Sequence, residues 1–184
     1  VGKKLDELER EGLLESTVVM FYSDHGVGLP RGKRSCYDTG TRVPLIVRFP
    51  DRARAGETED RVVQFVDFGP TVLSLCGIAP DQRLDGVPFL GPHRREGGGY
   101  AFSHADRFDS VYDRQRSVSD GRFRYVRNYA VDQPYLIRNA YRERIPMTAD
   151  LYALRGRRDV PAAQWQFAAT RRPREELYDT HEDP

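Results

Sequence analysis

Apolar and polar residues follow one another along the first part of the chain in a pattern that predicts a helix and two strands. Residues 1–14 repeat their apolar side chains at helical spacing, which predicts an amphipathic helix. Thr17–Tyr22 (TVVMFY) is an uninterrupted apolar run, typical of a central parallel strand that is covered on both faces. Val43–Phe49 (VPLIVRF) predicts a second strand.

The next pattern is a helix followed by a break in composition. Asp67 is a suitable N-cap for a helix that Gly77 ends. With the two strands before it, this helix predicts an α/β layer architecture. Consecutive glycines among charged residues interrupt the pattern at 91–99. We therefore expect two parts: residues 1–92 of an α/β domain, and residues 93–184 of a small, truncated C-terminal α+β subdomain.

The C-terminal part carries the signals of antiparallel strands. Asp120-Gly121 is a strong two-residue hairpin signal between two strand-like runs. Residues 100–103 predict a strand before this hairpin, and residues 176–179 predict a last short strand. Residues 130–174 contain several Pro and Arg residues without a clean period, so we expect loops and short helices there.

Net charge argues against two classes of partner. The chain has 29 basic and 28 acidic residues, so no overall field attracts nucleic acid or a membrane surface. Four arginines of the hairpin alternate with apolar and aromatic residues, a mixture that nucleic-acid-binding proteins also show. A solvated hairpin face with its other face buried explains the mixture better. The arginines are Arg116, Arg122, Arg124 and Arg127.

The cysteines and the hydropathy pattern indicate neither a redox or metal motif nor a membrane span. Cys36 and Cys76 form no C-x-x-C pattern, and we expect both to be free and buried. No apolar run approaches the roughly 18 residues that span a bilayer, and the N-terminus has no charged-then-apolar signal pattern. We expect no membrane partner, while the oligomeric state stays open.

The best candidate site follows the first predicted strand. Ser23, Asp24, His25 and Gly26 stand where open α/β sheets place their ligands. A carboxylate beside an imidazole can ligate a metal, although an N-cap followed by a surface histidine would give the same letters. Lys33, one of only three lysines, lies eight residues past His25 in a glycine-flanked loop. From there its ammonium could return to the metal and face an anionic substrate.

At these residues the sequence resembles the sulfatase family of the alkaline-phosphatase-like fold. In that family a strand ends in S-D-N-G or S-D-H-G, and a loop of the form K-G-x-x-x-E-G-G-x-R-V-P follows. The positions in register with that loop are Lys33, Asp38, Gly40, Arg42, Val43 and Pro44. Three positions depart from it: Arg34 replaces a common glycine, Asp38 the usual glutamate, and Thr39 another glycine.

Further matches extend the resemblance over nearly the whole chain. They are the helix at 67–77, the L-D-G segment at 84–87 and E-L-Y-D at 176–179. The segments P-R-G-K and R-Y-V-R-N-Y look most like the heparan N-sulfatase (sulfamidase) branch. The resemblance implies an α/β fold, namely the C-terminal part of an alkaline-phosphatase-like sandwich with a mostly parallel sheet, followed by a smaller antiparallel-sheet subdomain.

The resemblance also implies roles for the candidate residues. Asp24 and His25 would supply half of the shell of a divalent metal, and Lys33 would bind sulfate or leaving-group oxygens. The family expectation is Ca²⁺, while the softer imidazole of His25 makes Mn²⁺ an alternative. The nucleophile would be a formylglycine made from an upstream Cys or Ser that this chain lacks, since neither Cys36 nor Cys76 stands in a C-x-P-S-R type motif.

Two further groups have both a functional and a structural interpretation. His104, Arg107 and Asp109 could reach the site from the second subdomain and contact a sugar carboxylate or sulfate. A polar loop between strands would look the same. We expect Arg42 to be structural and to hold the lysine loop through a charge-assisted bond.

The sequence therefore predicts a fragment of a metal-dependent sulfatase whose substrate is a sulfated carbohydrate, through an O-sulfate or N-sulfate. The 184-residue chain alone should be inactive, because the resemblance implies that the nucleophile and two metal ligands lie upstream of it. Alternatives are a phosphodiesterase or phosphonate monoester hydrolase of the same fold, and a noncatalytic module that binds an anionic glycan. The location is not encoded in the chain, but the resemblance implies an exported (periplasmic or extracellular) or lysosomal protein.

Overall fold

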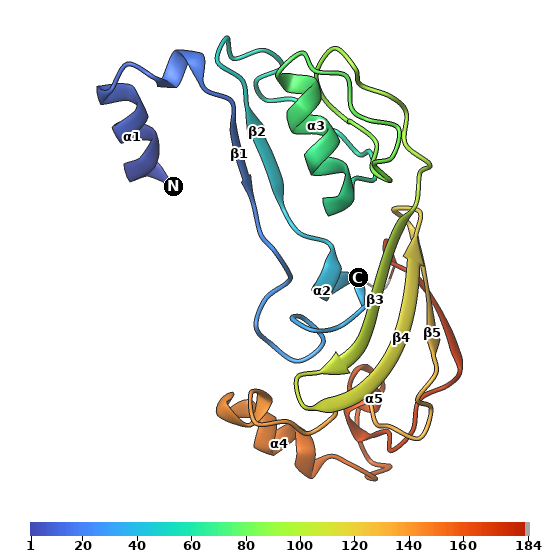
Figure 1. Ribbon diagram of the computed structural model, residues 1–184. Helices are drawn as coiled ribbons and strands as arrows, with labels where there is room; N and C mark the ends of the chain where they lie inside the picture. Colours follow the sequence, from blue (N-terminus) through green and yellow to red (C-terminus); the bar gives the residue numbers. More distant parts are fainter. Residues whose placement is uncertain (183–184) are drawn as a thin grey trace.

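The computed structural model describes residues 1–182, in which an N-terminal group of elements lies above a C-terminal sheet (Figure 1). The N-terminal elements are α1 (Gly2–Arg10), the 3₁₀ turn Leu14–Ser16, β1 (Val19–Tyr22), α2 (Asp38–Thr41), β2 (Leu45–Arg48), the 3₁₀ turn Phe65–Asp67 and α3 (Phe68–Leu75). The C-terminal elements are β3 (Ala101–Phe108), β4 (Val111–Ser119), β5 (Phe123–Asn128), the 3₁₀ turn Arg142–Arg144, α4 (Met147–Ala153), the 3₁₀ turn Ala162–Gln164, α5 (Trp165–Ala168) and β6 (Glu175–Asp179).

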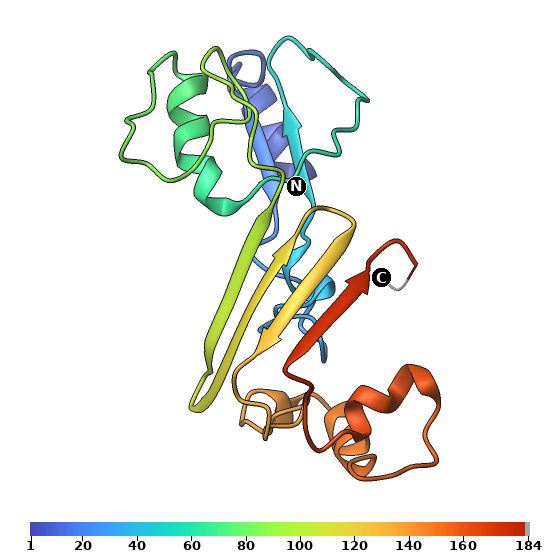
Figure 2. The same ribbon diagram turned by 90° about the vertical axis from the view of Figure 1, so that its right-hand side faces the viewer.

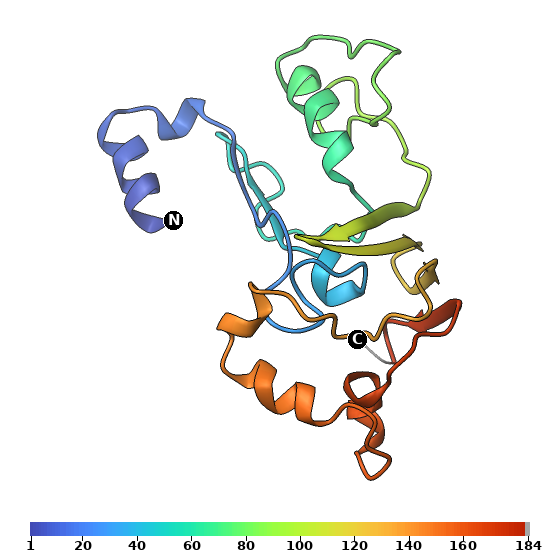
Figure 3. The same cartoon turned by 60° about the horizontal axis from the view of Figure 1, so that its bottom comes forward.

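The predicted amphipathic helix is present as α1, but none of its residues is buried. Figure 3 shows α1 standing apart from both sheets. An apolar stripe gains free energy only when another element covers it. The stripe of α1 is therefore left open by the described part of the chain.

β1 and β2 lie where the sequence predicts strands, but they pair antiparallel, with Val19 opposite Arg48. The expectation of parallel order is thus wrong for this pair. The apolar run of β1 indicates a strand that is covered on both faces, and that property does not fix strand direction. Within this chain the cover is incomplete, since Phe21, Tyr22 and Ile46 are 45%, 45% and 61% exposed.

α3 confirms the predicted helix, with Asp67 at its N-cap position and a left-handed Gly77 (φ +75°) just beyond its end. The Asp67 carboxylate does not cap α3 itself. It accepts the backbone N–H groups of Gln64 at 2.9 Å and Val87 at 2.8 Å. Asp67 therefore ties the L-D-G segment to the start of the helix.

The C-terminal sheet is antiparallel throughout, in the order β3-β4-β5-β6, as Figure 2 shows. Asp120 and Gly121 join β4 to β5 as predicted, and Gly121 has φ +98°. β3 continues to Phe108, well beyond the predicted end at residue 103. It forms a long hairpin with β4, with a register shift between Ala105 and Arg107.

One face of this sheet is buried yet mostly polar. Its buried polar residues on β4, β5 and β6 are Asp113, Gln115, Ser117, Ser119, Arg124, Asn128 and Glu176, beside the apolar Val126. Arg124 is only 4% exposed, so the prediction that the hairpin arginines lie on a solvated face is wrong for this residue. A buried arginine is tolerated when carboxylate and carbonyl oxygens satisfy its N–H groups. Cys36 and Tyr37 of the N-terminal part are buried as well and supply contacts to this face.

Residues 129–174 form loops with the short helices α4 and α5, in agreement with the sequence. Buried arginines fix this segment by donating to backbone carbonyl oxygens, for example Arg142 to Ile137 at 3.1 Å. Within residues 1–182, every helix is too short or too polar to cross a membrane.

Candidate active site

The Ser23–Gly26 turn follows β1 directly, as the sequence predicts. The Ser23 hydroxyl donates to the carbonyl oxygen of His25 at 2.6 Å, which closes the turn on itself. The backbone N–H of Gly26 donates to Gly40 at 3.0 Å, and a Cβ on Gly26 would lie 1.8 Å from the Thr39 carbonyl oxygen. Only glycine permits this approach, so the turn is locked against the far end of the loop that follows.

The geometry of Asp24 and His25 fits a metal. His25 Nδ1 lies 2.8 Å from the carbonyl oxygen of Gly26. A carbonyl can only accept, so Nδ1 carries a proton, and in the neutral tautomer with this proton Nε2 presents a lone pair. Nε2 lies 3.6 Å from Asp24 Oδ1, a separation that two ligands of one ion can have. Metal-binding histidines commonly donate their other N–H in this way.

The pair is also open, because the Asp24 side chain is 83% exposed and that of His25 is 36% exposed. Among the described residues, no further His, Cys, Asp or Glu joins them within reach of one ion. The chain therefore offers two ligand atoms, and a tight divalent site needs more than two.

The lysine loop, defined as residues 26–42, doubles back toward His25. The backbone N–H of Lys33 donates to the carbonyl oxygen of Val27 at 2.7 Å. Gly32 allows this return, since a Cβ there would lie 2.1 Å from the same oxygen. The backbone of Lys33 thus lies beside residues that immediately follow the candidate metal ligands.

The side chain of Lys33 has a different neighbour from the one that the sequence suggests. Its ammonium lies 5.3 Å from the ring centre of Tyr141, a cation–π distance. No described contact joins this ammonium to Asp24 or His25. Convergence of the three groups on one pocket therefore stays a prediction.

Asp109, a member of the predicted substrate-binding set, contacts the lysine loop through Arg34. Its carboxylate accepts two N–H groups of the Arg34 guanidinium at 2.8 and 3.1 Å. His104 and Arg107 belong to β3 rather than to a loop, and both are exposed. Their role in substrate binding stays a prediction.

Asp38 anchors the far end of the lysine loop, but Arg42 is not its main partner. The nearest Arg42 nitrogen is 3.9 Å from Asp38, and the Arg42 side chain is 66% exposed. Instead, Arg124 of β5 donates to Asp38 at 3.0 Å and to the Cys36 carbonyl oxygen at 3.2 Å. A buried, charge-assisted pair restricts the loop more than an exposed one.

Tyr37 of the same loop connects it to β6. Its hydroxyl donates to the Glu176 carboxylate at 3.1 Å, and burial, with Glu176 nearby, raises the pKa of this hydroxyl well above its usual range. Glu176 also accepts from Asn128 Nδ2 at 2.5 Å, from Tyr135 at 2.9 Å and from Tyr178. The glutamate and tyrosine of E-L-Y-D thus serve as structural groups that hold the lysine loop.

Positive charge collects where the loop meets the C-terminal part. A cavity of about 20 Å³ is lined by Arg31, Arg34, Arg142 and Arg172, with Asp113 among them. Burial lowers the pKa of Arg142 to about 10, and the neighbouring Arg34 and Arg172 contribute to this shift. The two loop arginines on either side of Lys33, Arg31 and Arg34, therefore share this cavity with guanidinium groups of the C-terminal part.

The two cysteines differ, contrary to the expectation that both are buried. Cys36 is buried and Cys76 is exposed, and both are free. Burial, helped by the charge of Asp113, raises the pKa of the Cys36 thiol to about 11. A thiol that stays protonated at neutral pH is a poor nucleophile, which agrees with the absence of a catalytic motif around it.

Sequence reasoning missed several groups that shape this site. Tyr141 lies in a region without any period, and Arg124 belongs to a pattern that a solvated hairpin face would also give. Arg34 did carry a signal, because it departs from the glycine that the resembled family commonly has there.

Comparisons with known proteins agree with the motifs. The family model described as "Sulfatase" matches residues 1–78. An ulvan-active sulfatase of Formosa agariphila is 42% identical over all of this chain, which covers 31% of that relative. The human N-sulphoglucosamine sulphohydrolase is 38% identical over 79 residues, or 42% of this chain and 16% of that protein. The chain thus spans about a third or less of the length of these relatives.

Solved structures support the fold at low sequence identity. A protein crystallised in complex with its substrate D-glucosamine-2-N,6-O-disulfate has a TM-score of 0.65 at 22% identity, over 100% of this chain and 31% of that one. A 2-O GAG sulfatase has a TM-score of 0.62 at 20% identity, over 99% of this chain and 34% of that one. In both cases this chain matches about a third of a longer chain.

Proposed function

Because this chain belongs to the sulfatase family, we propose that it forms one wall of a metal-dependent sulfatase active site in a longer enzyme. The substrate of that enzyme would be a sulfated carbohydrate. The names of the similar proteins support this class, since they include an N-sulphoglucosamine hydrolase and a complex with a glucosamine disulfate. The sugar, the choice between N-sulfate and O-sulfate and an exported or lysosomal location remain predictions.

The geometry of the Ser23–Gly26 turn is the observation that carries the proposal. The turn fixes the proton of His25 on Nδ1 and leaves Nε2 free, 3.6 Å from an exposed Asp24 oxygen. Asp24 and His25 would hold a divalent ion, Ca²⁺ or Mn²⁺, with further ligands from outside this chain. When bound, such an ion polarises sulfate oxygens and draws off developing negative charge.

Lys33 would act on the substrate side of the ion. A preorganised ammonium at the end of a constrained loop stabilises oxygens on which charge builds during cleavage of the sulfate ester. The rigid backbone of the loop lowers the cost of bringing the ammonium into place. The formylglycine nucleophile of the family would come from a part of the enzyme outside this chain.

Substitution of Lys33 in the intact enzyme tests this function. We expect Lys33→Ala to lower kcat on a sulfated substrate by roughly 100-fold, as removal of one preorganised oxyanion donor does. Lys4→Ala is the matched control, since Lys4 lies on α1 with its side chain 82% exposed. A loss of less than about threefold for Lys33→Ala would remove Lys33 from the site.

A further inference from the structure

The backbone at Arg34 is left-handed, with φ +69°. Glycine adopts this conformation freely, whereas a residue with a Cβ carries a steric penalty there. The resembled family commonly has glycine at this position, so the conformation explains that preference. In this chain the arginine side chain must bring interactions that compensate for the penalty.

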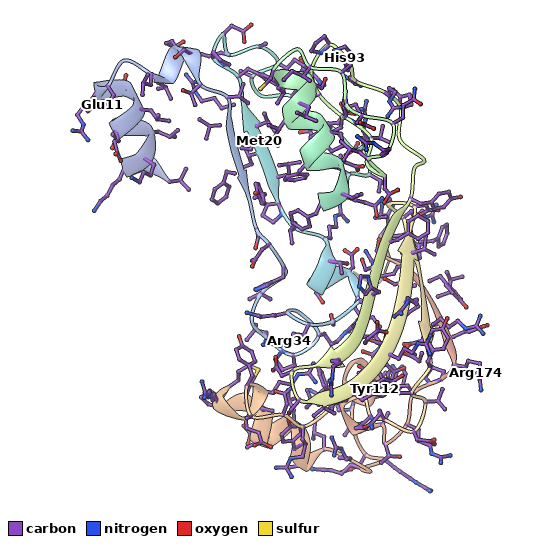
Figure 4. The ribbon with its side chains drawn as sticks, in the orientation of Figure 1. Glu11, Met20, Arg34, His93, Tyr112 and Arg174 are labelled. Atoms are coloured by element: carbon purple, nitrogen blue, oxygen red, sulfur yellow. The ribbon has the colours of Figure 1, made fainter. Side chains whose placement is uncertain are left out.

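Those interactions come from two separate segments. The Arg34 guanidinium donates twice to Asp109, in the turn between β3 and β4. Its central carbon also lies 4.0 Å from the ring centre of Tyr141, close enough for a stacked cation–π contact. Figure 4 shows Arg34 at the lower end of the lysine loop, where these segments meet.

Strained backbone conformations and side-chain contacts occur together around Arg34. Asp109 is itself left-handed, with φ +54°, and so is Arg31 of the lysine loop, with φ +67°. Non-glycine residues in this region persist only where surrounding contacts hold them, and they gather at functional sites. The Tyr141 ring that receives Arg34 also receives the Lys33 ammonium. Arg34, Asp109 and Tyr141 thus form one clamp, the Arg34 clamp, next to Lys33.

We propose that Arg34 is a positioning residue for Lys33, which fixes the lysine backbone by anchoring it to Asp109 and Tyr141. This inference rests on the proposed function of Lys33. The Arg34–Asp109 pair is partly exposed, with side chains 25% and 41% accessible, so it adds little to global stability. Its effect is to remove alternative conformations of the loop, so that the ammonium needs less reorganisation when substrate binds.

The test is a double-mutant cycle in the full-length enzyme. We expect Arg34→Ala to lower kcat on a sulfated substrate roughly 10-fold, while KM, metal content and the thermal midpoint stay nearly constant. In the Lys33→Ala background the same change should cost less than about twofold, because Arg34 acts through Lys33. Asp109→Asn removes only the anchor, and its loss should depend on Lys33 in the same way.

Arg138→Ala provides the matched control. Arg138 also contacts one carboxylate, Glu143 at 3.2 Å, and one ring, Tyr152 at 4.8 Å, but it lies outside the lysine loop. It should leave kcat unchanged. If Arg34→Ala costs less than about twofold, or costs the same with and without Lys33, the positioning role is wrong. If Lys33→Ala itself has no effect, the proposed function fails instead. If Arg34→Ala does not fold, Asp109→Asn decides between the same outcomes.

Discussion

The lysine loop and the Asp24–His25 pair lie on adjoining stretches of chain, but their surroundings differ. The loop is tied to the C-terminal sheet through Arg124 and Glu176, both buried, and through the partly exposed Arg34 clamp. The Asp24 carboxylate is 83% exposed, and His25 Nε2 lies 3.6 Å from it. Under the proposed function, this chain builds the proposed anion-binding side by itself, while the proposed metal side needs ligands from outside it. Substitutions of the buried groups on the first side should affect folding, whereas substitutions on the second side should affect only metal binding and activity.

The largest expected effect belongs to the buried ion pair beneath the loop. Arg172 and Asp113 have side chains 2% and 4% exposed and lie 2.5 Å apart. Asp113→Ala would leave a buried guanidinium without its carboxylate, so we expect the free energy of unfolding to fall by about 3–5 kcal/mol. Urea denaturation of the intact enzyme measures this. Asp159→Ala, in the exposed pair with Arg157, should change nothing measurable; equal effects would show that the Arg172–Asp113 pair contributes no special stability.

Substitution of Asp24 should weaken metal binding without lowering the stability of the fold. Asp24→Ala should weaken divalent metal binding by more than roughly 100-fold, since loss of a group that only supports a ligand already costs 10- to 100-fold. The thermal midpoint without metal should not move, because the carboxylate is exposed. Titration calorimetry with Ca²⁺ and Mn²⁺ measures the affinity, with Asp150→Ala on α4 as the control. Unchanged affinity in Asp24→Ala would exclude this residue as a ligand.

The smallest expected effect is that of removing one hydroxyl, that of Tyr37 in the lysine loop. Tyr37→Phe removes one of several donors to Glu176, and a typical net contribution of such a bond is about 1 kcal/mol. Thermal or urea unfolding of the variant checks this value. Tyr112→Phe, on exposed β4 surface, should have no effect. A larger loss in Tyr112→Phe than in Tyr37→Phe would contradict the role of the Glu176 network.

The sequence predicted most elements because their signals are local. The Asp120-Gly121 hairpin depends on residues that are close in the chain, and so does the α3 helix that Gly77 ends. Strand direction depends on a partner far away in sequence, which is why the antiparallel pairing of β1 with β2 was not foreseen. For the same reason the sequence named Asp109 as a candidate but did not predict its pairing with Arg34.

The inward face of the C-terminal sheet shows a second limit. Hydrophobic alternation identifies a buried face only when that face is apolar, and here Gln115, Arg124 and Asn128 point inward. Each has a polar partner: Gln115 donates to Asn128, Asn128 donates to Glu176, and Arg124 donates to Asp38. Such pairing cannot be read from a local pattern. The sequence did predict the Asp24–His25 pair, because these residues are adjacent in the chain. It did not predict the distant residues that hold the lysine loop.

A crystal structure of the intact enzyme with bound divalent metal and a sulfated ligand is the most direct test of the central claim. We expect an Asp24 carboxylate oxygen and His25 Nε2 to ligate the ion, and the Lys33 ammonium to lie within hydrogen-bonding distance of a sulfate oxygen. The Arg34–Asp109 pair should be intact in that complex. A metal bound without Asp24 and His25, or a Lys33 ammonium that stays on Tyr141 away from the sulfate, would contradict the claim.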